Sequence, residues 1–216
     1  MATGRALLFD YVGVLTSDVA DSSAVFERAV GLPEGRCFEL LLADASTAPG
    51  GGVLPAFERG EADAAVFERR LRELLVADGA RLPPGDLLPR LFAHVRPQGR
   101  LWDVAARARA AGIPTALVSN SWGMDIYSFD WIDAHFDVRV ISGEVGLRKP
   151  EPAIFELAAQ RVGVAPQACV FVDDHERNVV AARRLGMAAV HHRGDELWTA
   201  RRLADALGIE VASDGR

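Results

Sequence analysis

The sequence predicts an α/β protein with a doubly wound parallel sheet and an all-helical insertion near its amino terminus. Three observations lead to this prediction. After residue 97, short apolar segments alternate with longer segments of helical periodicity, which is the pattern of a parallel sheet covered by helices on both faces. Between residues 17 and 96, apolar residues recur at helical spacing and no convincing strand occurs. With 216 residues, half of them hydrophobic and a quarter charged, the chain is long enough for one sizeable core and an insertion.

The first predicted strand covers residues 6–9 and ends at Asp10, where a turn through Val12 and Gly13 begins. A carboxylate at the carboxyl end of such a strand lies where α/β sheets present their reacting groups. Taken alone, this Asp is equally well explained as a turn residue or a helix cap.

The insertion reads as helix because its apolar residues fall on one broad face. In the clearest segment, Phe57, Phe67 and Leu71 share that face, while neighbouring arginines lie largely off it. We therefore expect an all-helical insertion at 17–96, which we call the cap.

The remaining residues, 1–16 and 97–216, are expected to form the α/β core. The predicted elements after the cap are helix 99–111, strand 114–119, strand 136–141, helix 151–163, strand 168–173, helix 175–185, strand 187–191 and helix 195–207. Carboxyl ends of parallel strands meet at one edge of a sheet, so polar residues there face one crevice, which the cap would roof.

The strand that ends at Ser119 is followed by Asn120 and, two residues later, by Trp122. A hydroxyl and an amide at this position could donate hydrogen bonds to phosphate oxygens. They could equally cap the next helix, and Trp122 could either contact a substrate or pack beneath the cap.

Lys149 stands in the Gly-rich run 142–150, directly before Pro150. A residue before proline is disfavoured in a helix, so this Lys is expected to leave from a loop. Its compact charge could reach both a carboxylate and a phosphate. Most isolated lysines are simply solvated surface groups.

The strand at 168–173 leads into Asp173 and Asp174, and Asn178 follows four residues later. Oxygen ligands of this kind suit Mg²⁺, which keeps several of its waters. An alternative is that Asp173 and Glu176 form a capping box at the start of the next helix.

These four segments, in this order, resemble the four motifs of the haloacid dehalogenase-like hydrolase superfamily, in the subfamily with a helical cap after the first motif. The resemblance implies a Mg²⁺-dependent phosphatase in which Asp10 forms an aspartyl-phosphate with a small phosphorylated substrate. It implies that Ser119, Asn120 and Lys149 hold the phosphoryl oxygens, with Trp122 as a further substrate contact. The metal ligands that it implies are Asp10, the carbonyl of Val12, Asp174, and either Asp173 or Asn178.

Val12 departs from this pattern, because most phosphatases of the superfamily carry there a second Asp that acts as acid and base. A positioned acid or base contributes about 10²–10⁴ in rate. Two alternatives therefore stay open: a 2-haloacid dehalogenase, which needs neither the second Asp nor Mg²⁺, and a catalytically weak domain that binds a phosphometabolite or a protein. Against the dehalogenase stands the pair Asp173–Asp174, which is costly without a nearby cation.

Composition restricts the partners. The net charge of −6 and the pI near 5.4 argue against binding to nucleic acid and to anionic membranes. Two cysteines, Cys37 and Cys169, are expected to be reduced, and no apolar run reaches the ~20 residues of a membrane span. Since the first strand begins near residue 6, no signal peptide is expected and the predicted location is cytoplasmic. The substrate and the oligomeric state stay open.

Several other polar residues are expected to have ordinary roles. Glu58 and Arg59 are interpreted as exposed charges at a helix end, and His175 as a solvated residue of a first helical turn. His191 and His192 are interpreted as edge or loop residues, because adjacent side chains on a strand point to opposite faces.

Overall fold

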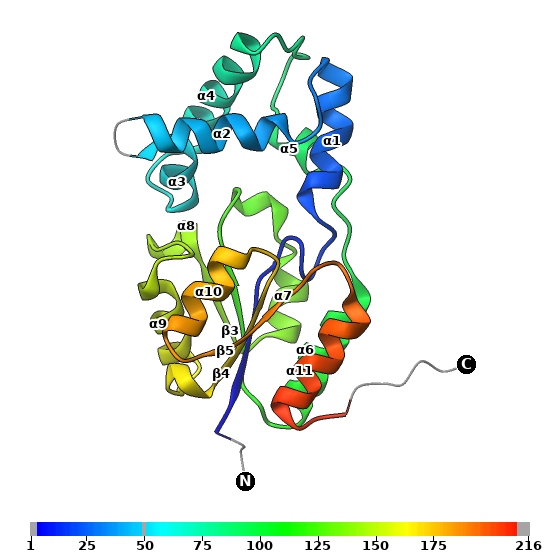
Figure 1. The fold of residues 1–216 in the computed structure, drawn as a ribbon, viewed down its shortest axis with the longest axis vertical. Helices are drawn as coiled ribbons and strands as arrows, with labels where there is room; N and C mark the ends of the chain where they lie inside the picture. Colours follow the sequence, from blue (N-terminus) through cyan, green and yellow to red (C-terminus); the bar gives the residue numbers. More distant parts are fainter. Residues whose placement is uncertain (1–3, 49–50, 211–216) are drawn as a thin grey trace, which may run out of the picture.

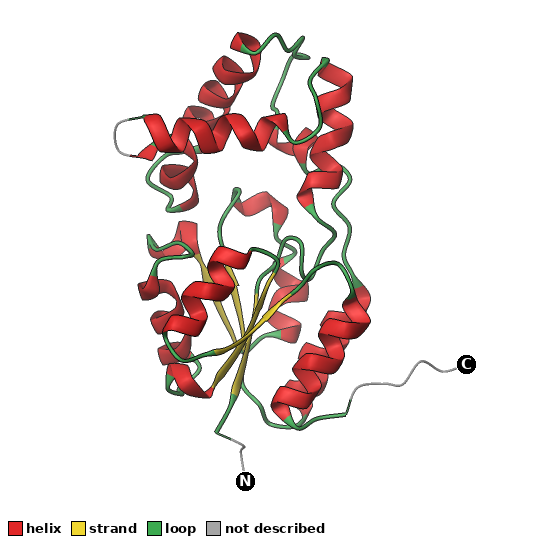
Figure 2. Ribbon diagram, viewed as in Figure 1, coloured by secondary structure: helices red, strands yellow, loops and turns green. Residues whose placement is uncertain are grey.

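The computed structural model describes residues 4–48 and 51–210 and has two layers of structure, one above the other (Figure 1). The lower layer contains the sheet with its helices, and the upper layer contains only helices (Figure 2). The strands are β1 (Ala6–Phe9), β2 (Thr115–Ser119), β3 (Val138–Ile141), β4 (Cys169–Asp173) and β5 (Ala188–His191). The α-helices are α1 (Val19–Val30), α2 (Arg36–Thr47), α3 (Val53–Glu58), α4 (Ala64–Ala77), α5 (Leu88–Leu91), α6 (Gly99–Ala110), α7 (Phe129–His135), α8 (Ser142–Val145), α9 (Pro152–Arg161), α10 (Glu176–Arg184) and α11 (Glu196–Leu207), with short 3₁₀ turns η2 (Met124–Ile126) and η3 (Pro166–Ala168).

The sheet is parallel throughout, in the order β3-β2-β1-β4-β5, which confirms the predicted fold class. All residues of β1, β2 and β4 are buried, as expected for strands that are covered on both faces. Because β1 lies between β2 and β4, the loops after these three strands converge at one edge of the sheet.

Alternate residues of β1 supply the two faces of the core. Leu7 and Phe9 pack with residues of α6, α7 and α11, whereas Ala6 and Leu8 pack with residues of α9 and α10. This division follows from the two-residue period of side chains along a strand.

The helices α1 to α5 enclose a separate apolar cluster that includes Phe57, Phe67 and Leu71, which form the periodic face noted in the sequence. Local signals set two of the helix starts. The Asp18 carboxylate accepts a hydrogen bond from the backbone N–H of Ala20, and Asp63 does the same for Val66.

Two chain segments that run side by side join the upper layer to the sheet. Thr16 and Pro97 form an isolated antiparallel bridge, and Ser17 N donates to the carbonyl of Arg96 at 2.7 Å. The chain thus leaves the lower layer and returns to it at almost the same point. No helix in the described part of the chain is long and apolar enough to cross a membrane.

The predicted elements agree with the observed ones to within about two residues, and two short helices were missed. Helix α7 follows β2, and α8 is a single turn after β3. Strand β3 starts at Val138, two residues later than predicted, because Phe136 ends α7.

Candidate active site

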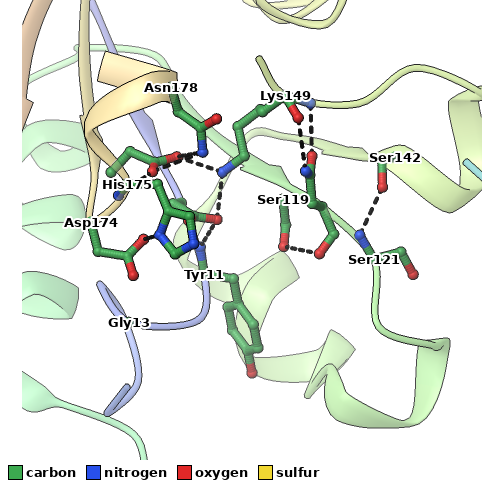
Figure 3. A network of polar contacts seen from close by, with 12 residues as sticks. Tyr11, Gly13, Ser119, Ser121, Ser142, Lys149, Asp174, His175 and Asn178 are labelled. Carbon is green, nitrogen blue, oxygen red and sulfur yellow. Dashed lines mark hydrogen bonds and ion pairs between the residues drawn. The ribbon is translucent and has the colours of Figure 1, made fainter. Parts of the chain in front are cut away.

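Asp10, Lys149 and Asp173 form a buried ionic network at the carboxyl edge of the sheet. Figure 3 shows the Lys149 side chain of this network, with Asn178 and Ser119 nearby. The Lys149 ammonium lies 2.7 Å from Asp10 Oδ1 and 2.7 Å from Asp173 Oδ2, and the lysine is only 1% exposed. Three elements supply the partners, since Asp10 follows β1, Asp173 ends β4, and Lys149 comes from the loop between α8 and α9. The buried Lys149 ammonium therefore contacts the carboxylate of Asp10, and Asp10 lines a cavity.

Burial and the neighbouring charges of opposite sign shift the pKa values of Asp10 and Lys149, and they act in opposite directions. Burial raises the pKa of Asp10 to about 8, because Lys149 only partly offsets it and Asp173 and Asp174 raise it further. For Lys149 burial acts to lower the pKa, but the two neighbouring carboxylates outweigh it and the net shift is upward. The lysine is therefore charged at neutral pH, and a further cation beside Asp10 would favour its ionised form.

Asp173 holds Lys149 and is itself fixed by hydrogen bonds from two other residues. Its Oδ1 accepts hydrogen bonds from the backbone N–H of His175 at 2.8 Å and from Asn178 Nδ2 at 2.9 Å, and Asn178 Nδ2 also reaches its Oδ2. The capping box of Asp173 and Glu176, which the sequence left as an alternative, is absent, because His175 is the N-cap of α10 and makes no side-chain hydrogen bond there. Asp173 was predicted among the metal ligands, but these contacts favour a role in holding Lys149.

The side chain of Asp174 points to the side opposite from that of Asp173, toward the turn after β1. A Cβ atom added to Gly13, whose φ is +84°, would lie 2.5 Å from Asp174 Oδ2, so only glycine fits here without a shift. Asp174 Oδ1 is buried without a hydrogen-bond partner, although the His175 ring Nδ1 lies 2.9 Å away. Burial acts to raise the pKa of Asp174, but the contact with His175 outweighs it and the pKa is lowered.

The oxygens near Asp10 suit a small hard cation. Asp10 and Asp174 offer carboxylates, and Asn178 Oδ1 is buried without a hydrogen-bond partner. Unpartnered buried oxygens of this type are costly unless a cation or water satisfies them. Val12 lines the same cavity.

Ser119 and Asn120 lie where the sequence predicted them, at the end of β2. The Ser119 hydroxyl is 2.9 Å from the hydroxyl of Tyr127, a buried residue whose contact with Ser119 the sequence did not show. The Asn120 side chain binds the backbone of Lys149 twice: Lys149 N donates to its Oδ1 at 2.8 Å, and its Nδ2 donates to the Lys149 carbonyl at 3.0 Å. Asn120 therefore fixes the loop that carries the lysine.

Glu58 was predicted to be an exposed charge, and this prediction is wrong. It ends α3, is 3% exposed, and accepts hydrogen bonds from Arg148 Nε and, at 3.4 Å, from Asn120 Nδ2. Its backbone carbonyl accepts from the Ser142 hydroxyl, and nearby Arg59 pairs with Glu151. Burial raises the pKa of Glu58, with Arg148 acting against the shift. The insertion thus contacts the loops that hold Asn120 and Lys149.

Three of the five histidines lie at or just after the ends of β4 and β5, and they differ in their surroundings. His175 is more than half exposed, whereas His191 Nε2 contacts the backbone carbonyl of Asp174 at 2.8 Å. His192 lies in the loop directly after β5, as predicted, but it is buried and its Nδ1 contacts the Thr199 hydroxyl at 2.8 Å.

A cavity of about 600 Å³ lies between the two layers and brings the predicted residues together. Its lining includes Asp10, Val12, Ser119, Asn120, Trp122, Lys149, Asp174 and Asn178, together with residues of α1, α2 and α3. Of the predicted site residues, only Asp173 is absent from the lining, since it is covered by Lys149 and Asn178. Trp122 borders the cavity and also packs on Phe38, Phe67 and Phe92.

Curated relatives match parts of the chain. A phosphoserine phosphatase of Thermus thermophilus is 38% identical over 90 residues, which are 39% of this chain and 36% of that protein. The chain spans less than half the length of this relative and of other curated relatives that it matches, such as the bifunctional epoxide hydrolase 2 of Rattus norvegicus.

Solved structures match almost the whole fold. A dehalogenase structure has a TM-score of 0.69 at 19% identity and covers 97% of this chain and all of that one. A haloacid dehalogenase family enzyme of Bacteroides thetaiotaomicron, solved as a magnesium complex, has a TM-score of 0.64 at 21% identity, with 92% and 98% covered. The sequence model of the haloacid dehalogenase-like hydrolases matches residues 5–186. With this match over most of its length, the chain belongs to the haloacid dehalogenase-like hydrolase family.

Proposed function

We propose that the protein is a Mg²⁺-dependent phosphatase that acts on a small phosphorylated metabolite through an aspartyl-phosphate at Asp10. The observation that carries the proposal is the buried Lys149 ammonium, held by Asp173 and placed 2.7 Å from the Asp10 carboxylate. A fixed charge beside a nucleophile is what phosphoryl transfer requires, since its catalysis is mainly positioning and electrostatic stabilisation.

In the first step an Asp10 oxygen forms a bond to phosphorus while the bond between phosphorus and the ester oxygen breaks. The leaving alkoxide takes a proton from water, because Val12 offers none. In the second step water attacks the phosphorus of the aspartyl-phosphate, releases inorganic phosphate and restores the Asp10 carboxylate. Ser119, the backbone N–H of Asn120 and Lys149 hold the transferring oxygens.

Asp10, the backbone carbonyl of Val12 and Asp174 would hold the Mg²⁺ ion, with Asn178 Oδ1 as a further oxygen. The unpartnered Asn178 Oδ1 and the Asp174 carboxylate, which lines the same cavity, support this assignment. When bound, the ion would neutralise charge on the phosphoryl oxygens and on the three neighbouring carboxylates. We further propose that residues 17–96 act as the cap over this site, since Glu58 of α3 holds the loops beneath it.

A second candidate is a 2-haloacid dehalogenase, which Val12 favours. In that reaction an Asp10 oxygen attacks carbon and displaces halide, a leaving group that needs no proton. The carboxylate of such a substrate could occupy the position between Ser119 and Lys149.

The first test compares the two reactions in one preparation. We expect the purified protein to release phosphate from a panel of phosphate monoesters in millimolar Mg²⁺ and to lose this activity in EDTA. Chloride release from 2-chloropropionate should stay at background in either buffer. Chloride release that persists in EDTA, without phosphate release in Mg²⁺, would establish the dehalogenase instead.

The missing acid leads to a second prediction, on leaving groups. Activity should depend steeply on leaving-group pKa, with aryl and acyl phosphates cleaved far faster than alkyl phosphates, because a poor alkoxide gains most from protonation. Val12→Asp should flatten this dependence and raise the rate for alkyl phosphates by about 10²-fold.

Val12→Asn is the matched control, because it adds a polar group of similar size that cannot donate a carboxyl proton. Since Val12 packs against the core, the midpoint of thermal unfolding should be measured for both variants. An equally shallow leaving-group dependence in the parent and in Val12→Asp would mean that another group supplies the proton.

A further inference from the structure

The cavity has two chemically different ends. Its reacting end carries Asp10, Ser119 and Lys149, whereas α1, α2, α3 and the loop after β2 supply an apolar wall. This wall consists of Val19, Phe38, Leu42, Leu54 and Trp122. An occupant with a charged head and an apolar body matches both ends.

Leu42 on α2 has the most exposed side chain of this wall. It remains 51% exposed, whereas Leu54 is 5% exposed and Leu41, its neighbour on the same helix, is buried in the cluster of the upper layer. Large apolar side chains that border a cavity are typical of ligand sites, where they gain burial when the ligand binds.

The two acidic residues beside the apolar wall, Glu58 and Asp18, already have hydrogen-bond partners. Glu58 is paired with Arg148, and Asp18 caps α1 by accepting from Ala20 N. Among the described residues that line the cavity, the only cations besides a protonated His175 are Lys149 and Arg177, and Lys149 is bound to Asp10 and Asp173. Arg177 lies on α10, which belongs to the lower layer. The apolar side chains of the wall therefore offer no cation to a second anionic group. Among the described lining residues, Arg177, whose charge also acts to lower the pKa of Glu58 of α3, is the one cation outside the reacting end.

We infer that the substrate is a phosphate monoester whose alcohol is an uncharged, largely apolar group, such as a medium alkyl or an aryl group. The inference rests on the proposed function and adds the substrate class. A cavity of about 600 Å³ falls within the range that holds molecules of this size. Sugar phosphates and phosphorylated hydroxy acids would place hydroxyls or a carboxylate against the apolar wall and lose hydration without compensation.

The test is a series of straight-chain esters: ethyl, butyl, hexyl and octyl phosphate in Mg²⁺. The leaving-group chemistry is constant along this series, so a change in kcat/KM reports binding of the alkyl chain. We expect kcat/KM to rise by up to about fourfold for each buried methylene. Glucose 6-phosphate and an alkyl phosphate with a terminal carboxylate should be poorer than hexyl phosphate.

Two variants test whether the apolar wall causes the increase in kcat/KM with chain length. Leu42→Ser should reduce the increase in kcat/KM with chain length, because it removes part of the wall. Val76→Ser is the matched control: Val76 is 55% exposed on α4 and is not among the residues that line the cavity, so the increase should be unchanged.

Binding of n-alkylphosphonates, measured in Mg²⁺ by the shift in the midpoint of thermal unfolding, gives a readout without turnover. Longer phosphonates should raise the midpoint more. Phosphate release with a flat or falling chain-length series, or an equal increase in Leu42→Ser and Val76→Ser, would overturn the inferred substrate class and leave the phosphatase intact. Absence of phosphate release from every ester, aryl phosphates included, would overturn the proposed function, and the phosphonate series would then show whether the apolar wall binds alkyl chains.

Discussion

Asp10→Asn is expected to reduce phosphate release by about 10⁴-fold or more, to background. Asn is nearly isosteric but cannot form the acyl phosphate, and loss of the nucleophile removes the covalent route entirely. The fold should persist, since Lys149 keeps its partner Asp173 at 2.7 Å and an asparagine oxygen can still accept from Tyr11 N. Residual turnover close to that of the parent would contradict covalent catalysis through Asp10.

Stability measurements separate chemistry from folding in this variant. Burial raises the pKa of Asp10 from 3.8 to about 8, so the metal-free folded state binds a proton more tightly than the unfolded chain does. Between these two values, stability contributed by this group is lost as the pH rises. In EDTA, Asp10→Asn should therefore be at least as stable as the parent at neutral pH and show a weaker fall in stability from pH 4 to 8.

The intermediate gives an independent check. Acid quench during turnover should trap a phosphoryl group on the peptide that contains Asp10, because acyl phosphates survive brief acid treatment. The parent should carry this added mass, and the Asn variant should not.

Lys149→Met is expected to damage both stability and turnover. Methionine has a similar length but leaves Asp10 and Asp173 buried without their cation, which costs about 3–5 kcal/mol of unfolding free energy. Loss of a positioned charge on the transferring phosphoryl group should lower kcat by about 10²–10³. Chemical denaturation and steady-state kinetics, both in Mg²⁺, measure the two effects.

The double variant Lys149→Met with Asp173→Asn separates the loss of stability from the loss of turnover. Removing one carboxylate together with the lysine lowers the net buried charge, so much of the lost stability should return. The activity should not return, because the charge on the phosphoryl group is still missing. Recovery of turnover in the double variant would mean that Lys149 acts only as a structural partner of Asp173.

The sequence predicts the meeting of Asp10, Ser119, Lys149 and Asp174 for a geometric reason. Each follows a buried parallel strand or its connection, and strands β1, β2 and β4 are neighbours whose carboxyl ends share one edge. Sheet topology thus brings together residues that lie far apart in the chain.

The sequence could not show contacts that depend on how the helical insertion lies on the sheet. Glu58 follows an ordinary amphipathic pattern, and only the placement of α3 over α8 buries it against Arg148. The role of Asp173 also depends on direction, because two adjacent carboxylates at a strand end leave to opposite sides. Helix α8 is a single turn and is too short to produce a periodic signal.

The bridge between Thr16 and Pro97 has a consequence for the order of folding. Strand β1 must pair with β2, where Leu7 stands opposite Thr115, although the whole insertion separates them in the chain. Closing a loop costs conformational entropy that grows with the logarithm of its length. An insertion that collapses first, with its two ends side by side, shortens the effective loop between β1 and β2 from about 100 residues to about 25, which saves about 1 kcal/mol. Early formation of α1 to α5 would therefore speed the pairing of the central strands.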